Sequence, residues 1–139
     1  MDKITLIFVG IVACLVSIAA ATPGIASFYT DYVPSTCFGM TPQGNAVAQV
    51  DDALWENGAA CGKLFTVTCT GPRTVIPHPC TGKSATVMVV EHCPECTSTF
   101  VLSREAFAFI SDPLAGKIDI DYHPYALTHL LVISIDFSV

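Results

Sequence analysis

Apolar and polar residues alternate over short stretches of the chain, and this period of two is typical of half-buried β-strands. Turns rich in glycine and proline separate the stretches, for example Asn57-Gly58 and the segment 72–79. Many short strands joined by such turns indicate a closed or nearly closed β-barrel. The pattern predicts strands over residues 24–29, 46–50, 63–70, 84–91 and 116–122.

One helix is expected after Ser103, which is a good N-cap residue. Glu105 lies in its first turn, where the helix dipole favours an acid, and Asp112-Pro113 ends it. The apolar face of this helix consists of Ala106, Phe107 and Ile110. A shorter helical turn is expected over residues 53–56, after Asp51-Asp52.

The two ends of the chain do not follow the strand pattern. Residues 4–20 are apolar and end in small alanines, so residues 1–21 are predicted to be a signal peptide, with Thr22 as the first mature residue. A membrane anchor is the main alternative, because the run approaches the roughly 20 residues that span a bilayer. A second alternative is a bacterial lipoprotein site at Cys14. Residues 22–125 would form one domain, and residues 126–139 an apolar C-terminal tail to which no role is assigned.

Whether the cysteines form disulfides depends on whether this leader directs secretion. The chain has seven, and six remain once Cys14 leaves with the signal peptide. In an oxidising compartment six cysteines favour three disulfides, although spacing leaves the pairing open. His92 precedes Cys93-Pro94-Glu95-Cys96, so half a zinc site or a redox pair is an alternative there. A structural bridge is preferred, and no metal or cofactor is expected.

The charge of the chain limits the classes of partner that it can bind. The net charge is −6, with only six Lys and Arg residues. Nucleic-acid binding and an anionic membrane surface are therefore disfavoured. A polysaccharide, a cell-surface receptor or a small ligand remains a candidate partner. After signal cleavage, the protein is not expected to insert stably into a membrane.

Several motifs occur in one order along the mature chain. They are Ala26-Ser27-Phe28-Tyr29, Cys37-Phe38-Gly39, Leu54-Trp55-Glu56-Asn57-Gly58-Ala59-Ala60-Cys61-Gly62, Phe65-Thr66-Val67-Thr68-Cys69, Cys80-Thr81-Gly82, Val89-Val90-Glu91-His92-Cys93 and Leu102-Ser103-Arg104-Glu105-Ala106-Phe107. In these the chain resembles the plant natriuretic peptide-like proteins, which are relatives of the expansin N-terminal domain and of family-45 endoglucanases.

The resemblance implies a mainly β fold, a six-stranded double-psi β-barrel with one or two short helices. It implies secretion to the plant cell wall space (apoplast) and a role in water and solute homeostasis through a cell-surface partner, as a monomer. It also implies the disulfides Cys37–Cys61, Cys69–Cys80 and Cys93–Cys96.

The resemblance also places a groove. Ser27 and Tyr29 match its first-strand pair, and Glu91 stands at its first acidic position. Val101 stands where the relatives have an aspartate, and glycoside hydrolysis needs two carboxylates. The protein is therefore predicted not to be an enzyme. Asp31 and Asp121 are the alternative sources of a second carboxylate.

Two further functions remain open beside signalling. One is a wall polysaccharide-binding module whose groove uses Ser27, Tyr29 and Glu91, with Trp55 able to stack on a sugar ring. Trp55, the single tryptophan, is also a candidate core residue. The other is a residual glycoside hydrolase that depends on Glu91.

Overall fold

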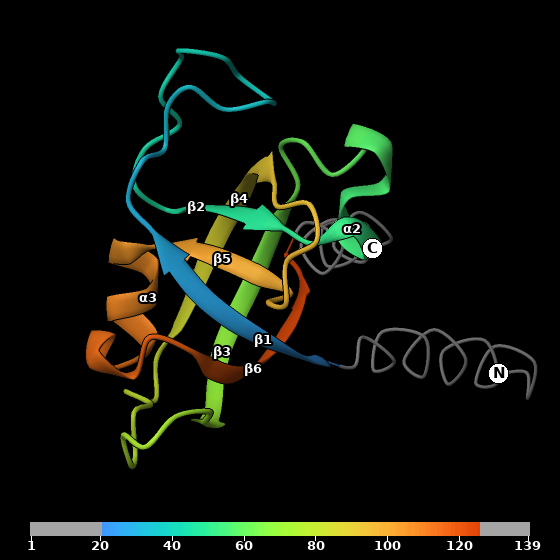
Figure 1. The fold of residues 1–139 in the computed structure, drawn as a ribbon. Helices are drawn as coiled ribbons and strands as arrows, with labels where there is room; N and C mark the ends of the chain where they lie inside the picture. Colours follow the sequence, from blue (N-terminus) through green and yellow to red (C-terminus); the bar gives the residue numbers. More distant parts are fainter. Residues whose placement is uncertain (1–20, 126–139) are drawn as a thin grey trace, which may run out of the picture.

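Six strands close into a barrel in the computed structural model, which describes residues 21–125 (Figure 1). Their order around the barrel is β1-β5-β2-β4-β3-β6. Residues 1–20 of the predicted leader (1–21) and the tail over 126–139 lie outside the described residues. The strands are β1 (Thr22–Tyr29), β2 (Val47–Val50), β3 (Leu64–Pro72), β4 (Ser84–His92), β5 (Phe100–Ser103) and β6 (Ile118–Pro124). The closed six-stranded barrel expected from the sequence is confirmed.

The barrel is mixed. β1 runs parallel to β5 and β2 parallel to β4, whereas the other four neighbouring pairs are antiparallel. Alternate residues of each strand fill the interior, because successive side chains point to opposite faces. In β3 the inward residues are Phe65, Val67 and Cys69, and in β4 they are Ala85, Val87 and Val89.

Strand β5 was not predicted from the alternation. Its four residues are all buried, so the run Phe100–Ser103 has no polar positions to mark a period of two. It lies between β1 and β2 and brings Phe100 and Leu102 into the core.

A capping side chain marks the start of each α-helix. α3 (Arg104–Ile110) begins after Ser103, whose hydroxyl oxygen accepts a hydrogen bond from the Ala106 N–H at 3.3 Å. The same hydroxyl donates to the Asn45 carbonyl at 2.5 Å, and the predicted face of Ala106, Phe107 and Ile110 is buried. α2 (Asp52–Trp55) is capped by Asp51, and the 3₁₀ turns are η1 (Glu56–Gly58) and η2 (Pro113–Ala115).

Three disulfides hold the connections. They join Cys37 to Cys61, Cys69 to Cys80 and Cys93 to Cys96, the pairs that the family resemblance implies. Both cysteines next to His92 are thus used in a bridge, and residues 21–125 contain no cluster of three metal-ligating side chains. In this part of the chain no helix is both long and apolar enough to cross a membrane.

Candidate functional site

A row of four side chains crosses the outer face of β1, β5, β2 and β4. Ser27 is paired with Val101, Val101 with Gln49, and Gln49 with Glu91. Paired residues on neighbouring strands project to the same face of a sheet. The row faces outward because the residues beside Ser27, Val101 and Gln49 face the interior. Ala26, Ala48, Val50, Phe100 and Leu102 belong to the core, and Phe28 packs against it.

A β-bulge decides where Glu91 points. Ala85, Val87 and Val89 face inward, so strict alternation along β4 would turn Glu91 inward as well. The register shifts between Ala48 and Gln49, which pair with Val89 and Glu91 respectively, and Val90 is the extra residue. A bulge re-aims the side chains that follow it. Glu91 therefore lies on the outer face beside Gln49.

The carboxylate of Glu91 holds the connection between β1 and β2, residues 30–46, which we call the β1–β2 loop. It accepts a hydrogen bond from the Thr36 N–H at 2.9 Å and another from the Thr36 hydroxyl. The His92 N–H also donates to it, at 3.0 Å. Three donors on one carboxylate indicate a clamp on the loop.

Tyr29, at the end of β1, is half-buried beside this clamp. Its ring meets the ring of Tyr32 edge-on, with centroids 5.1 Å apart. Burial, and then the negative charge of Glu91, raise the pKa of Tyr29 well above its usual range. Its hydroxyl is buried without a hydrogen-bond partner among residues 21–125. Tyr29 thus presents a neutral phenol next to an acid.

Trp55 is the last residue of α2 and stacks on His92 at the end of β4. Its ring lies parallel to the imidazole of His92, with centroids 5.0 Å apart and an interplanar angle of 3°. The Nε2 atom of His92 lies 2.6 Å from Oδ1 of Asp52, which fixes the imidazole. Trp55 is half-buried and packs against the core, which is one of the two roles considered for it. One face of its ring is already covered by His92.

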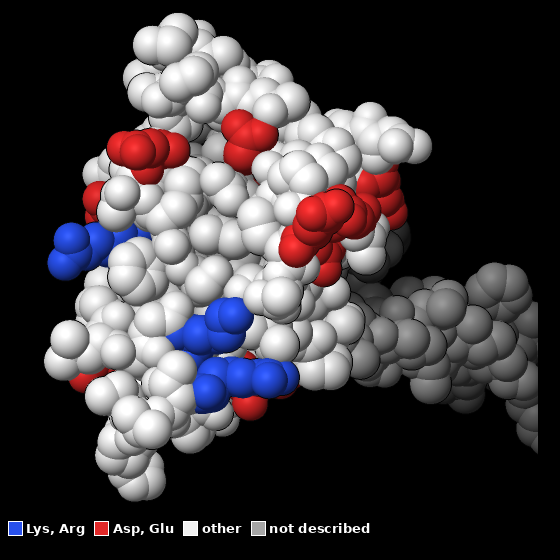
Figure 2. All heavy atoms as spheres, in the orientation of Figure 1, with Lys and Arg blue, Asp and Glu red and all other residues white. Residues whose placement is uncertain are grey.

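The charges around the row suit a neutral ligand. Figure 2 shows the same face as Figure 1, with most of its acidic side chains in the upper part, basic ones at the left edge and lower centre, and uncharged surface between them. α2 and α3 flank this face on opposite sides (Figure 1). With a net charge of −6, the protein disfavours a polyanion.

The row contains one carboxylate and no second one. Val101 lies between Ser27 and Gln49 and is 8% exposed. It is two strands from Glu91, which corresponds to about 9–10 Å between backbones. An inverting glycosidase separates its two carboxyl groups by about 6.5–9.5 Å. A carboxylate at position 101 would be near that spacing, but valine exchanges no proton.

The two alternative acids lie elsewhere. Asp31 is exposed on the β1–β2 loop, and Asp121 on β6 pairs with Pro23 and Thr68. Neither belongs to the row. Gln49 was not among the residues predicted for the groove, although its polar side chain between the apolar Ala48 and Val50 marked it as an outward residue of the predicted strand.

Comparisons with known proteins define the class. A family model described as lytic transglycolase matches residues 47–122. The expansin of Clavibacter michiganensis is 26% identical, with a TM-score of 0.60, over 76% of this chain and 50% of that one. A mutant of it in complex with cellohexaose has a TM-score of 0.59 at the same identity. The chain spans about half the length of this expansin. The fold and the row define an expansin-type double-psi β-barrel.

Plant relatives define the family more narrowly. "Putative EG45-like domain containing protein 1" of Arabidopsis thaliana is 54% identical over 89% of this chain and 100% of its own length. The EG45-like domain containing protein of Citrus jambhiri is 48% identical over 79% of this chain and 87% of its own. The chain belongs to the family of EG45-like domain-containing proteins.

Proposed function

We propose that the protein binds plant cell-wall polysaccharide without hydrolysing it. The observation that carries this proposal is the outward row Ser27–Val101–Gln49–Glu91, in which Glu91 is the single carboxylate and is engaged by Thr36. The expansin complex with cellohexaose supports a neutral glucan as the ligand class. Polar side chains and the edge of Trp55 would contact the sugar rings.

Binding to insoluble cellulose tests this proposal. The wild-type protein is expected in the pellet, and Gln49→Arg in the supernatant, because a long charged side chain would block the row. Thr86→Arg is the matched control, since Thr86 is an exposed residue of β4 nearer the start of that strand. Wild-type protein that stays in the supernatant, or release of reducing sugar ends, would overturn the proposal.

A second candidate is a role in water and solute homeostasis through a cell-surface partner. Val75 and Leu114 are 95% and 80% exposed, on two loops joined by a hydrogen bond of 3.0 Å from the Thr74 hydroxyl to the Ala115 carbonyl. Such apolar side chains suit contact with another protein. Swelling of wall-free protoplasts by the wild type, lost in the double variant Val75→Ser with Leu114→Ser, would support this role. No swelling by folded wild-type protein would exclude it.

Both functions place the protein outside the cell as a monomer. We propose that residues 1–21 are removed on secretion and that residues 22–125 carry the activity. N-terminal sequencing of the protein from culture medium should begin at Thr22, and a retained leader would contradict this. Sedimentation of the purified protein would detect any larger assembly.

A further inference from the structure

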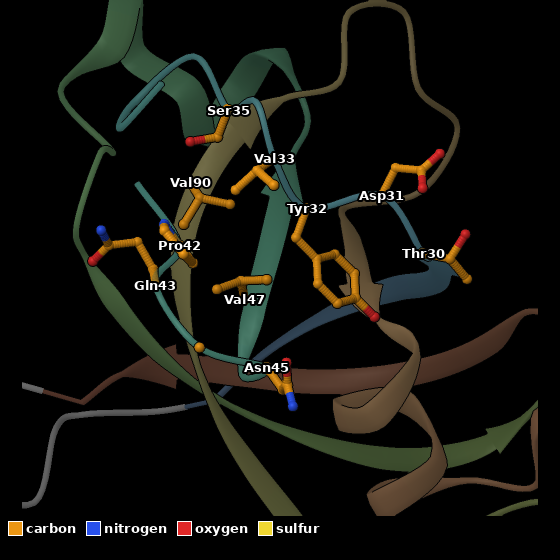
Figure 3. A pocket seen from close by; sticks show the side chains of 11 residues that line it. Thr30, Asp31, Tyr32, Val33, Ser35, Pro42, Gln43, Asn45, Val47 and Val90 are labelled. Atoms are coloured by element: carbon orange, nitrogen blue, oxygen red, sulfur yellow. The ribbon is translucent and has the colours of Figure 1, made fainter. Parts of the chain in front are cut away.

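A pocket of about 320 Å³ lies between the β1–β2 loop and the strands β2 and β4. It is separate from the row, because its lining includes none of Ser27, Gln49, Glu91 or Val101. Figure 3 shows the side chains of Val33, Val47 and Val90 around a common space, with the ring of Tyr32 on one side. The interior wall is therefore apolar. Its volume lies at the lower end of the range of small-molecule sites.

Both walls of the pocket are fixed without a ligand. On one side, the Tyr32 hydroxyl accepts from the Arg104 N–H at 3.0 Å and donates to the Glu105 carboxylate. Burial, and then this bond to Glu105, raise the pKa of Tyr32, so its ring stays a neutral wall. Farther along the same loop, the chain is held at Thr36 by Glu91 and at Cys37 by its disulfide. A preformed pocket avoids the cost of ordering on binding.

The rim of the pocket is polar, and several of its side chains are available to hydrogen-bond a ligand. The side chains of Asn45 and Asp31 make no hydrogen bond or ion pair within residues 21–125, and only the backbone carbonyl of Asn45 is engaged, by Ser103. The amide of Gln43 makes one long contact, 3.5 Å from its nitrogen to the Thr41 carbonyl. Asp31 lies at the edge with its carboxylate turned outward (Figure 3).

The electrostatic environment of the pocket is acidic. Asp31 is the one charged residue in its lining. Two further carboxylates stand immediately behind the walls, Glu105 on Tyr32 and Glu91 on Thr36. Arg104 is the neighbouring cation, and its backbone N–H is what reaches Tyr32. Three acids against one base favour a cationic ligand over an anionic one.

We propose that this pocket binds a small amphipathic amine. Its apolar group fills the space between Val33, Val47 and Val90, and its ammonium group lies at the rim near Asp31. Asn45 and Gln43 supply acceptors for the remaining N–H donors. The pocket and the row share no lining residue, so a substitution that leaves Glu91 in place can remove one function without the other.

A matched series of three probes tests the proposal: 2-phenylethylamine, 2-phenylethanol and phenylacetate. They share one apolar group and differ in the charge of the head. Titrations would be followed by NMR of the valine methyl groups in the wild-type protein. The amine is expected to shift the methyls of Val33, Val47 and Val90 and to bind roughly fivefold to tenfold more tightly than the alcohol. Phenylacetate is expected to bind weakest.

Two variants separate the charge at the rim from the overall charge of the protein. Asp31→Asn should bring the affinities for the amine and the alcohol close together, and Asp31 is exposed, so the fold should persist. Asp121→Asn removes the same charge from β6 and should leave the ratio unchanged. Equal affinity for all three probes in the wild type, or shifts at the exposed Val75 in place of the pocket valines, would overturn the proposal.

Discussion

The carboxylate of Glu91 on β4 and Thr36 in the β1–β2 loop are joined by two hydrogen bonds, from the backbone N–H and from the hydroxyl of Thr36. These bonds fix a loop that also lines a pocket. Glu91 is also a member of the row that we propose binds polysaccharide, so a substitution there would affect both the row and the loop.

Glu91→Gln should loosen this loop. Glutamine offers one acceptor oxygen where the carboxylate has two, and hydrogen bonds to a charged acceptor are the stronger ones. The free energy of unfolding in urea should fall by about 1–2 kcal/mol, and hydrogen exchange at the Thr36 N–H should accelerate. Glu95→Gln, at an exposed site, is the control and should change neither. Equal exchange rates in both variants would contradict the clamp.

Val101→Asp should not create a hydrolase. The new carboxylate would stand two strands from Glu91, but Glu91 would still be engaged by Thr36. The buried acid should lower the free energy of unfolding by about 1–3 kcal/mol. Reducing ends released from soluble cellulose derivatives should stay at the level of the wild type. A clear rise above that level would show that Glu91 is free for acid–base chemistry.

Tyr29→Phe should stabilise the protein. The variant removes a buried hydroxyl that has no hydrogen-bond partner among residues 21–125, and the gain should be about 1 kcal/mol. In the wild type the raised pKa means that the folded protein keeps a proton which the unfolded chain releases near pH 10. Stability should therefore fall as the pH rises above about 10.

The same variant should weaken that alkaline decline without abolishing it, because burial also raises the pKa of Tyr32 and Tyr122. Urea unfolding at a series of pH values, with the thiols kept oxidised, would measure both effects. A variant less stable than the wild type at neutral pH would indicate that the hydroxyl of Tyr29 makes a favourable contact.

The three disulfides should contribute unequally. Their cysteines are 24, 11 and 3 residues apart for Cys37–Cys61, Cys69–Cys80 and Cys93–Cys96. Loop-closure entropy then gives contributions of about 3.5, 3 and 2 kcal/mol. Replacing each pair by serines and measuring the free energy of unfolding would test this order. The order would be wrong if loss of Cys93–Cys96 proved as costly as loss of Cys37–Cys61.

Much of the architecture was determined by the sequence itself. Alternation in β3 and β4 predicted which face is buried, and Ser103 with its apolar face at Ala106, Phe107 and Ile110 predicted α3. These features could be predicted from the sequence because each depends on residues only a few positions apart. The motifs from Ala26 to Phe107 also indicated the expansin-like barrel, and the comparisons confirm it.

Only the tertiary structure decided the site. Alternation would have turned Glu91 inward, and the bulge opposite Gln49 turns it outward. β5 carries no period of two, so its pairing with β1 and β2, and the position of Val101 between Ser27 and Gln49, appear only once the barrel closes. The contact between Glu91 and Thr36 spans 55 residues of sequence. Contacts between distant residues depend on register and closure, which no local pattern encodes.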